Sequence, residues 1–240
     1  MVHLPQLQDH VVTFSIGVSK MKVFAVAGMP GAGKSTVMDR VKSEGFFVIR
    51  MGDLVMEEAR RRGINITDSN VGEMASQMRR ENRARIRGKN IPLTMFDADR
   101  KEKMNREGFG YWATKTVDRI LKSASSEVIF IDGTRGDKEI EVFRRRFNDF
   151  QVIAVHAPRR ERYKRVVSRK REDDVLSFDE LVARDERELS WGLGNVIATA
   201  DIMMVNDGPL EEFLTQIETF VRDIIKDIST ISCDCLCNDF

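Results

Sequence analysis

The sequence predicts a three-layer α/β fold, in which a five-stranded, mainly parallel sheet carries helices on both faces. Two observations lead to this prediction. Five short apolar segments alternate with longer segments of helical periodicity, and such alternation is typical of parallel sheets built from strand–helix–strand units. The first apolar segment also runs into a glycine-rich stretch that ends in Lys34 and Ser35, at the position where such folds bind phosphate.

The predicted strands are short apolar runs of the kind that is buried on both faces of a parallel sheet. In chain order they are 22–27, 46–49, 128–131, 152–155 and 201–205. The predicted helices are 34–44, 53–62, 71–81, 111–122, 138–147, 159–171, 178–189 and 210–228. Gly45 and Gly63 end the first two helices, and Asp68 or Ser69 can cap the third.

Composition limits the classes of protein that the chain can belong to. Its 240 residues suit one α/β domain with insertions. A net charge of +1, from 39 basic and 38 acidic side chains, does not favour nucleic acid as a partner. No apolar run approaches the ~18 residues of a membrane span, and no basic segment precedes the apolar stretch 11–18 as in a secretory signal. We therefore expect a cytoplasmic protein without a membrane partner.

The regular part of the chain begins at Met21. We expect residues 1–20 to be an N-terminal extension, although the stretch 11–18 could add an edge strand, and residues 21–228 to form the domain. Residues 229–240 would be a frayed, reducible tail that holds all three cysteines. Their one-residue spacing is too short for the usual zinc pairing.

The glycine-rich stretch matches the phosphate-binding pattern G-x-x-x-x-G-K-[ST] at every defined position. It lies between a predicted strand and a predicted helix, where successive N–H groups and the helix dipole bind phosphate, so the fold is that of P-loop NTPases. Lys34 is placed to reach the β- and γ-phosphates of ATP, and the Ser35 hydroxyl is placed to bind Mg²⁺. The residues expected to contact the nucleotide here are Gly28, Pro30, Gly31, Ala32, Gly33, Lys34, Ser35 and Thr36.

Two aspartates follow other predicted strands and are candidates for the same site. Asp132 directly follows the predicted strand 128–131, and a carboxylate at this end of a strand can hold Mg²⁺ directly or through water. Arg135 could clamp the phosphate of an acceptor with its bidentate guanidinium; the alternative is a solvated Arg after an Asp-Gly turn. Asp53 could cap the next helix, or it could face the γ-phosphate as a base or Mg²⁺ organiser.

A run of basic residues follows the fourth strand, from Arg159 to Arg171. Arg165 and Arg169 are four residues apart in it and share one helix face. Such a run is usually a solvated helix face, and an RNA-binding stripe is a second alternative. Close behind a phosphate site, it also fits a lid at about 159–187, whose arginines close over the transferred phosphoryl group.

These motifs together resemble the adenylate kinase and dephospho-coenzyme A kinase group of P-loop kinases, and within it an archaeal adenylate kinase-related family. Residues 21–82 and 106–228 carry the resemblance. It implies that Arg165 stacks on the adenine of ATP and that the turn at Asn206 contacts the edge of this base. It also implies phosphate contacts for Arg169, Arg171 and Arg184, with Arg187 as a nearby substitute.

The acceptor side departs from the pattern of this group. Met56 stands where adenylate kinases carry an Arg that contacts the phosphate of AMP. The segment from Asp132 to Arg135 is shortened and lacks the group's proline. The basic insertion 83–105 lies in the expected acceptor-binding region, about 53–112, and has no counterpart in the group.

We therefore expect an ATP- and Mg²⁺-dependent phosphotransferase that acts on a nucleotide-like acceptor, either a nucleoside monophosphate or a dephospho-coenzyme A-like alcohol. Asp132 and Asp53 would organise the metal and the acceptor. The insertion and Met56 leave two alternatives. One is a regulatory ATPase whose state is read by a protein or RNA partner, and the other is a nucleotide-binding module without a working acceptor site.

Overall fold

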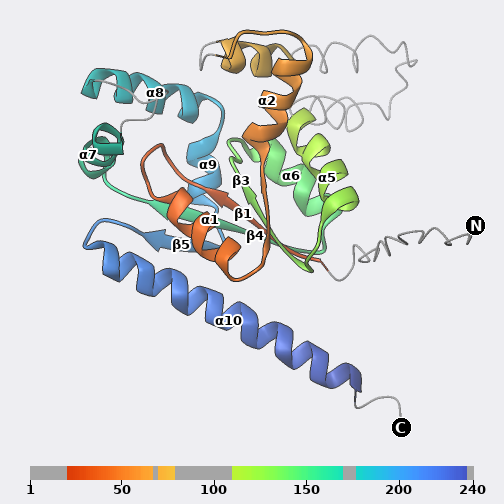
Figure 1. Cartoon of the computed structure of the whole chain (residues 1–240). Coiled ribbons are helices and arrows are strands. Elements are labelled where there is room, and N and C mark those ends of the chain that lie inside the picture. Colours follow the sequence, from red (N-terminus) through yellow and green to blue (C-terminus); the bar gives the residue numbers. More distant parts are fainter. Residues whose placement is uncertain (1–20, 67–69, 79–109, 170–176, 237–240) are drawn as a thin grey trace, which may run out of the picture.

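The computed structural model describes residues 21–66, 70–78, 110–169 and 177–236 (Figure 1). The strands are β1 (Lys22–Ala27), β2 (Phe47–Arg50), β3 (Val128–Asp132), β4 (Asp149–His156) and β5 (Ile202–Val205). The helices are α1 (Lys34–Ser43), α2 (Met51–Arg61), α5 (Tyr111–Ser123), α6 (Asp137–Arg146), α7 (Arg159–Arg169), α8 (Phe178–Ser190), α9 (Leu193–Ala198) and α10 (Leu210–Leu236). A further helical segment covers residues 70–78.

The strands form a single sheet in the order β2-β3-β1-β4-β5, and all four pairings are parallel. β1 lies at the centre, with β3 and β4 on either side. The register pairs Val26 with Asp132, so the last residue of β3 lies beside the carboxyl end of β1. The predicted five-stranded fold of P-loop NTPases is confirmed.

Helices α1 and α10 cover one face of the sheet (Figure 1). Val37 and Val41, one turn apart on α1, are fully buried there. The rings of Phe24 and Phe130 stack on neighbouring strands with their centroids 5.1 Å apart, and Phe220 of α10 meets Phe24 edge-on at 5.3 Å. Burial of this face fixes the direction of α1, and with it the position of the first residue of that helix, Lys34.

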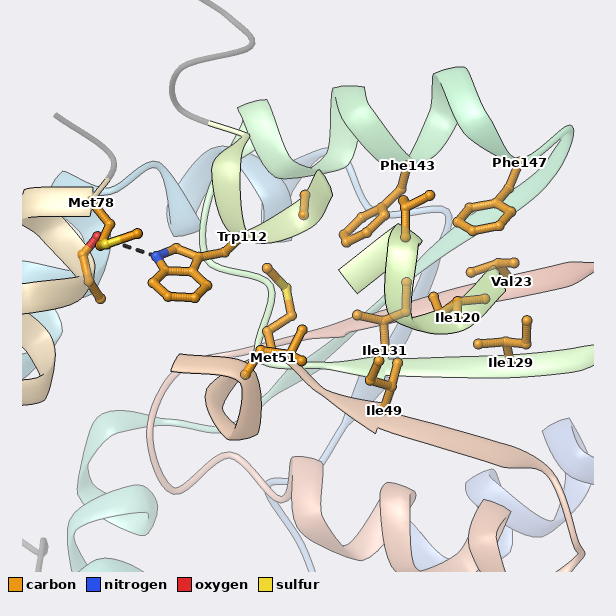
Figure 2. Close-up of a cluster of buried hydrophobic side chains, with 14 of the residues drawn as sticks. Val23, Ile49, Met51, Met78, Trp112, Ile120, Ile129, Ile131, Phe143 and Phe147 are labelled. Carbon is orange, nitrogen blue, oxygen red and sulfur yellow. Dashed lines mark hydrogen bonds between the residues drawn. The ribbon is translucent and has the colours of Figure 1, made fainter. Parts of the chain in front are cut away.

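Helices α5, α6 and α9 cover the opposite face (Figure 1). Phe143 of α6, Phe147 directly after that helix and Ile120 of α5 pack above the sheet residues in a continuous apolar cluster (Figure 2). At the edge of this cluster the indole N–H of Trp112 donates to the backbone oxygen of Ala75 at 3.3 Å. This bond ties the segment 70–78 to α5.

Several elements, such as β4, are longer or shorter than predicted by up to three residues at an end, and three further differences need a physical explanation. Helix α10 continues to Leu236, so the predicted helix end at residue 228 is wrong, because no Gly or Pro interrupts the following eight residues. Helix α9 is not predicted, since six residues are too few to show periodicity. Helix α2 begins at Met51 with Arg50 as its N-cap, so Asp53 is not the cap.

Some predictions concern residues outside the described ranges. These are the extension 1–20 with its edge strand, the cap at residues 68 or 69, the insertion 83–105 and the phosphate contact of Arg171. The side chain of Arg169 also lies outside the description. All of these stay predictions.

The outer edge of β5 is covered by a side chain of α10. The Gln216 amide oxygen accepts from the Val205 N–H at 3.1 Å, and the Gln216 amide nitrogen donates to the Val205 carbonyl at 2.8 Å. Both outward backbone groups of Val205 are thereby satisfied. The same contact holds the end of β5 in place, immediately before Asn206.

Candidate nucleotide-binding site

The loop between β1 and α1 is shaped by glycines in conformations that other residues rarely adopt. Gly31 has φ +79° and Gly33 has φ +113°. A Cβ on Gly31 would lie 2.8 Å from the Arg162 carbonyl oxygen, and one on Gly33 would lie 2.4 Å from Nδ2 of Asn206. The loop therefore lies directly against α7 on one side and the end of β5 on the other.

The carbonyl groups of this loop face donors outside it. The bonds run from Lys34 Nζ to Gly28 O (2.6 Å) and Met29 O (3.2 Å), from Arg162 Nη1 to Pro30 O (3.0 Å), and from Asn206 Nδ2 to Ala32 O (2.8 Å). Among the residues that the structure describes, none accepts from the N–H groups of Gly31, Gly33 and Lys34. A loop with satisfied carbonyls and available N–H groups fits an anionic phosphate chain.

The electrostatics at Lys34 match this geometry. Desolvation lowers the pKa of its ammonium from 10.5 to about 8, although the carboxylates of Asp132 and Glu188 oppose the shift. Arg135 and Arg184 lower this pKa further. A polyanion that enters the loop would stabilise the charged form of this lysine, because its negative charge offsets the loss of hydration that burial causes.

Binding of ATP should raise the pKa of Lys34 again, so we expect proton uptake on binding above pH 8. At pH 9 the free protein would hold this lysine mostly neutral, and the bound protein would hold it charged. Isothermal titration of ATP·Mg²⁺ in two buffers of different ionisation enthalpy should show an uptake that approaches about one proton. Equal enthalpies in both buffers would contradict the prediction, and Lys34→Ala should abolish the difference.

The same shift has a consequence for the ligand-free protein. Between pH 8 and 10.5 the unfolded chain binds more protons at Lys34 than the folded chain does. The contribution of this group to stability therefore rises with pH across that window, and below pH 8 its burial penalty is fully present.

Asp132 lies at the end of β3, beside the phosphate loop. Its side chain is largely buried, and Oδ2 lies 3.8 Å from Nε of Arg50 at the end of β2. The negative charge of Asp132 raises the pKa of Lys34, so the two side chains are within electrostatic reach. This is where the sequence predicts a carboxylate for Mg²⁺.

Arg135 follows on the same segment and is held by three side chains. Its backbone N–H donates to Oε2 of Glu139 at 2.9 Å, and its side-chain Nε lies 3.6 Å from Oε2 of Glu188. Its guanidinium carbon lies 5.3 Å from the ring centroid of Trp191, at the end of α8. Since the side chain remains 42% exposed, its guanidinium is accessible to a ligand.

Helices α7 and α8 bring further arginines to the loop. Arg184 lies near enough to Lys34 to lower its pKa. Arg165 donates to the backbone oxygen of Asn206 at 3.0 Å, while the Asn206 side chain donates to Ala32. The two residues expected at adenine are thus joined to each other and to the phosphate loop.

The remaining candidates lie around the loop. Ser35 and Thr36 are half-buried in the first turn of α1. Asp53 is exposed in the first turn of α2, three residues past the end of β2, and Met56 is half-buried on the next turn.

Sequence reasoning missed three residues at this site, namely Arg162, Asp185 and Glu188. Only 4%, 0% and 5% of their surfaces are exposed. The interpretation of the basic run as a solvated face is wrong for Arg162. A signal was available for the acidic pair, because Leu181, Asp185 and Glu188 follow one another at spacings of four and three, which places both carboxylates on the buried face of α8.

Comparison with known proteins agrees with this architecture. A family model described as an AAA domain matches residues 25–188. A UPF0200 protein of Methanothermobacter thermautotrophicus is 40% identical over 86% of this chain and 92% of its own length. The chain belongs to the UPF0200 family. The predicted relationship to an archaeal family of P-loop proteins is confirmed.

Other relatives extend the comparison. The UPF0200 protein of Methanoregula boonei is 34% identical over 86% of the chain and its entire length. The crystal structure of TT1252 from Thermus thermophilus superposes with a TM-score of 0.52 at 18% identity, covering 85% of this chain and 97% of that one. This likeness shows the fold. In the described residues no helix is both long and apolar enough to cross a membrane.

Proposed function

We propose that this protein transfers the γ-phosphoryl group of ATP to a small nucleotide-like acceptor. The observation that carries the proposal is the convergence of charged side chains on Lys34. Asp132, Glu188, Arg135 and Arg184 all shift its pKa, so all four lie within electrostatic reach of its ammonium. Phosphoryl transfer depends on such positioned charges, because the transferred group spreads negative charge over three oxygens.

The donor side of the reaction would be held by the loop and the two helices behind it. The loop N–H groups and Lys34 would bind the β- and γ-phosphates, and Arg184 would neutralise charge on the transferred group. Arg169 and Arg171 are proposed for the same task on the strength of the resemblance alone. Arg165, with the turn at Asn206, would bind the adenine.

Mg²⁺ would be held by the Ser35 hydroxyl and the Asp132 carboxylate. No cluster of three or more His, Cys, Asp or Glu side chains that could hold a metal occurs in the described part of the chain. Two protein ligands suit Mg²⁺, because this ion keeps several waters and takes its other ligands from phosphate. When bound, it would offset the charge of the β- and γ-oxygens.

The acceptor would bind on the side of Arg135 and Asp53. Arg135 carries an accessible guanidinium that suits a phosphate group. Asp53 would act as a base for an acceptor hydroxyl or as an organiser of Mg²⁺. A nucleoside monophosphate or a dephospho-coenzyme A-like alcohol meets both requirements, since each offers a phosphate together with a nucleophilic oxygen.

Incubation with labelled ATP and a panel of such acceptors tests the proposal. A phosphorylated product that depends on one acceptor class would support a kinase. Slow hydrolysis that only RNA or a protein stimulates would favour the regulatory ATPase. Binding of a dinucleoside pentaphosphate, which occupies donor and acceptor sites together, would argue against a nucleotide-binding module.

For the acceptor found in this way, Arg135→Ala should raise its KM by ~10-fold or more, because a charge-assisted bidentate contact is worth about 1.5–3 kcal/mol. The KM for ATP should change less than threefold. Steady-state kinetics with each substrate varied in turn would measure both. Arg144→Ala is the matched control, since Arg144 is an exposed arginine on α6 that pairs with Asp201. Equal losses for donor and acceptor would contradict the assignment of Arg135.

A further inference from the structure

A buried ion pair joins α7 to α8 behind the phosphate loop. The guanidinium of Arg162 donates from Nη1 to Oδ1 of Asp185 at 2.8 Å and from Nη2 to Oδ2 at 2.6 Å. Both side chains are almost completely buried, at 5% and 0% exposure. This bidentate geometry fixes direction as well as distance, because the planar fork of Arg matches the two oxygens of a carboxylate.

The same guanidinium also binds the phosphate loop. Nη1 of Arg162 donates to the Pro30 carbonyl oxygen at 3.0 Å, and Nε donates to the Ala157 carbonyl oxygen at 3.2 Å. The backbone of Arg162 lies against Gly31, where there is no room for a side chain. Arg162 therefore contacts the middle of the loop with both its backbone and its side chain.

Helix α8 presents functional candidates on either side of Asp185. Arg184 is its neighbour in the chain, and Glu188 lies three residues further on the same buried face. Glu188 approaches Arg135 at 3.6 Å, and Trp191 caps the end of the helix. A shift of α8 at Asp185 would therefore move both Arg184 and the Glu188 carboxylate that faces Arg135.

We propose that Arg162 and Asp185 are positioning residues that hold the phosphate loop in register with α8, so that triphosphate in the loop and the groups of α8 are aligned as one unit. This inference rests on the proposed binding of ATP by the loop. It extends the proposed function because neither side chain touches the reacting groups; each acts through Pro30 on one side and through Arg184 and Glu188 on the other.

A purely structural role is the alternative. Replacing a buried ion pair by well-packed apolar residues is often neutral for stability, whereas removing one partner is costly. A double variant therefore separates the two roles. If the pair only fills the core, the double variant Arg162→Met with Asp185→Leu should regain the stability of the parent, its ATP affinity and the response of α8 to ATP. If the pair positions the loop, this variant should recover stability alone.

The test is a titration with ATP·Mg²⁺ that needs no acceptor. In a Trp112→Phe background Trp191 is the only tryptophan of the chain, so its fluorescence reports on the end of α8. We expect the parent to bind ATP with a change in Trp191 emission. Asp185→Asn should weaken ATP binding by ~10-fold and remove at least half of the emission change at saturation, and the double variant should show both losses with a near-normal Tm.

Arg159→Met is the matched control. Nε of Arg159 donates to Oδ2 of Asp185 at 3.0 Å, the oxygen that also accepts from Nη2 of Arg162. The Arg159 side chain is 45% exposed, and the structure shows no hydrogen bond from it to the phosphate loop. Its ATP Kd should change less than twofold. Hydrogen exchange of α8 with and without ATP repeats the measurement in the native chain with both tryptophans.

The outcomes distinguish this inference from the function on which it rests. An unaltered emission change and Kd in the folded Asp185→Asn or double variant would overturn the positioning role and leave ATP binding intact. A parent protein that does not bind ATP at all would overturn both proposals.

Discussion

Lys34→Ala is expected to lower the rate of phosphoryl transfer by ~10³-fold, the upper range for removal of one positioned charge. Two losses combine in this variant. The β- and γ-phosphates lose their nearest cation, and the carbonyl groups of Gly28 and Met29 lose their hydrogen-bond donor. The measurement is the initial rate of product formation with saturating ATP and the acceptor identified by the panel.

Lys42→Ala is the control for this variant, because Lys42 is an exposed lysine near the end of the same helix. It should retain a rate within twofold of the parent. A Lys34→Ala protein that keeps more than a tenth of the activity, with the Tm of the parent, would show that the loop binds phosphate in another way.

Gly31→Ala is expected to have the second largest effect. The substitution places a methyl group 2.8 Å from the Arg162 carbonyl oxygen and 2.9 Å from Cγ2 of Val166, so either the loop or α7 must shift. Overpacking of this kind costs about 1–3 kcal/mol, and the left-handed conformation adds about 1–2 kcal/mol. We expect ATP affinity to fall by more than tenfold, measured by isothermal titration.

Gly45→Ala separates the two costs, because Gly45 has nearly the same φ, +84°, with no atom within 4 Å of an added Cβ. In urea unfolding this variant should be less stable than the parent by the conformational cost alone, about 1–2 kcal/mol. Its ATP affinity should equal that of the parent. Equal ATP affinities in the two variants would mean that the close approach of the loop to α7 has no part in binding.

The sheet and the phosphate loop could be predicted from sequence because their signals are local. A buried parallel strand is a continuous apolar run such as 128–131, and the loop pattern fixes four positions within eight residues. The order of the strands in the sheet carries no such local signal, since it depends on which helices pack over which strands. The C-terminal limit of α10 was missed for a related reason, as its last turns contain no residue that stops a helix.

The site was predictable where a motif marks a residue and unpredictable where packing assigns the role. Asp132 and Arg135 stand at the end of an apolar strand, so their position beside the loop follows from the fold. Arg162 lies within a run of basic residues in which Arg159, Arg160 and Lys164 are exposed, and only the tertiary contact with Asp185 distinguishes it from these three. The side chain of Asn206 binds Ala32 across 174 positions of the chain, a pairing without any sequence pattern.

The bond pair between Gln216 and Val205 has a consequence for how copies of this protein meet in solution. β5 is an edge strand, and an edge strand with free N–H and C=O groups offers a template on which a strand from another molecule can assemble. Gln216 occupies both of these groups at Val205. At this residue the sheet cannot grow by recruiting a neighbour, so the exposed Met203 and Val205 side chains lie on an edge that is closed to cross-β aggregation where Gln216 covers it.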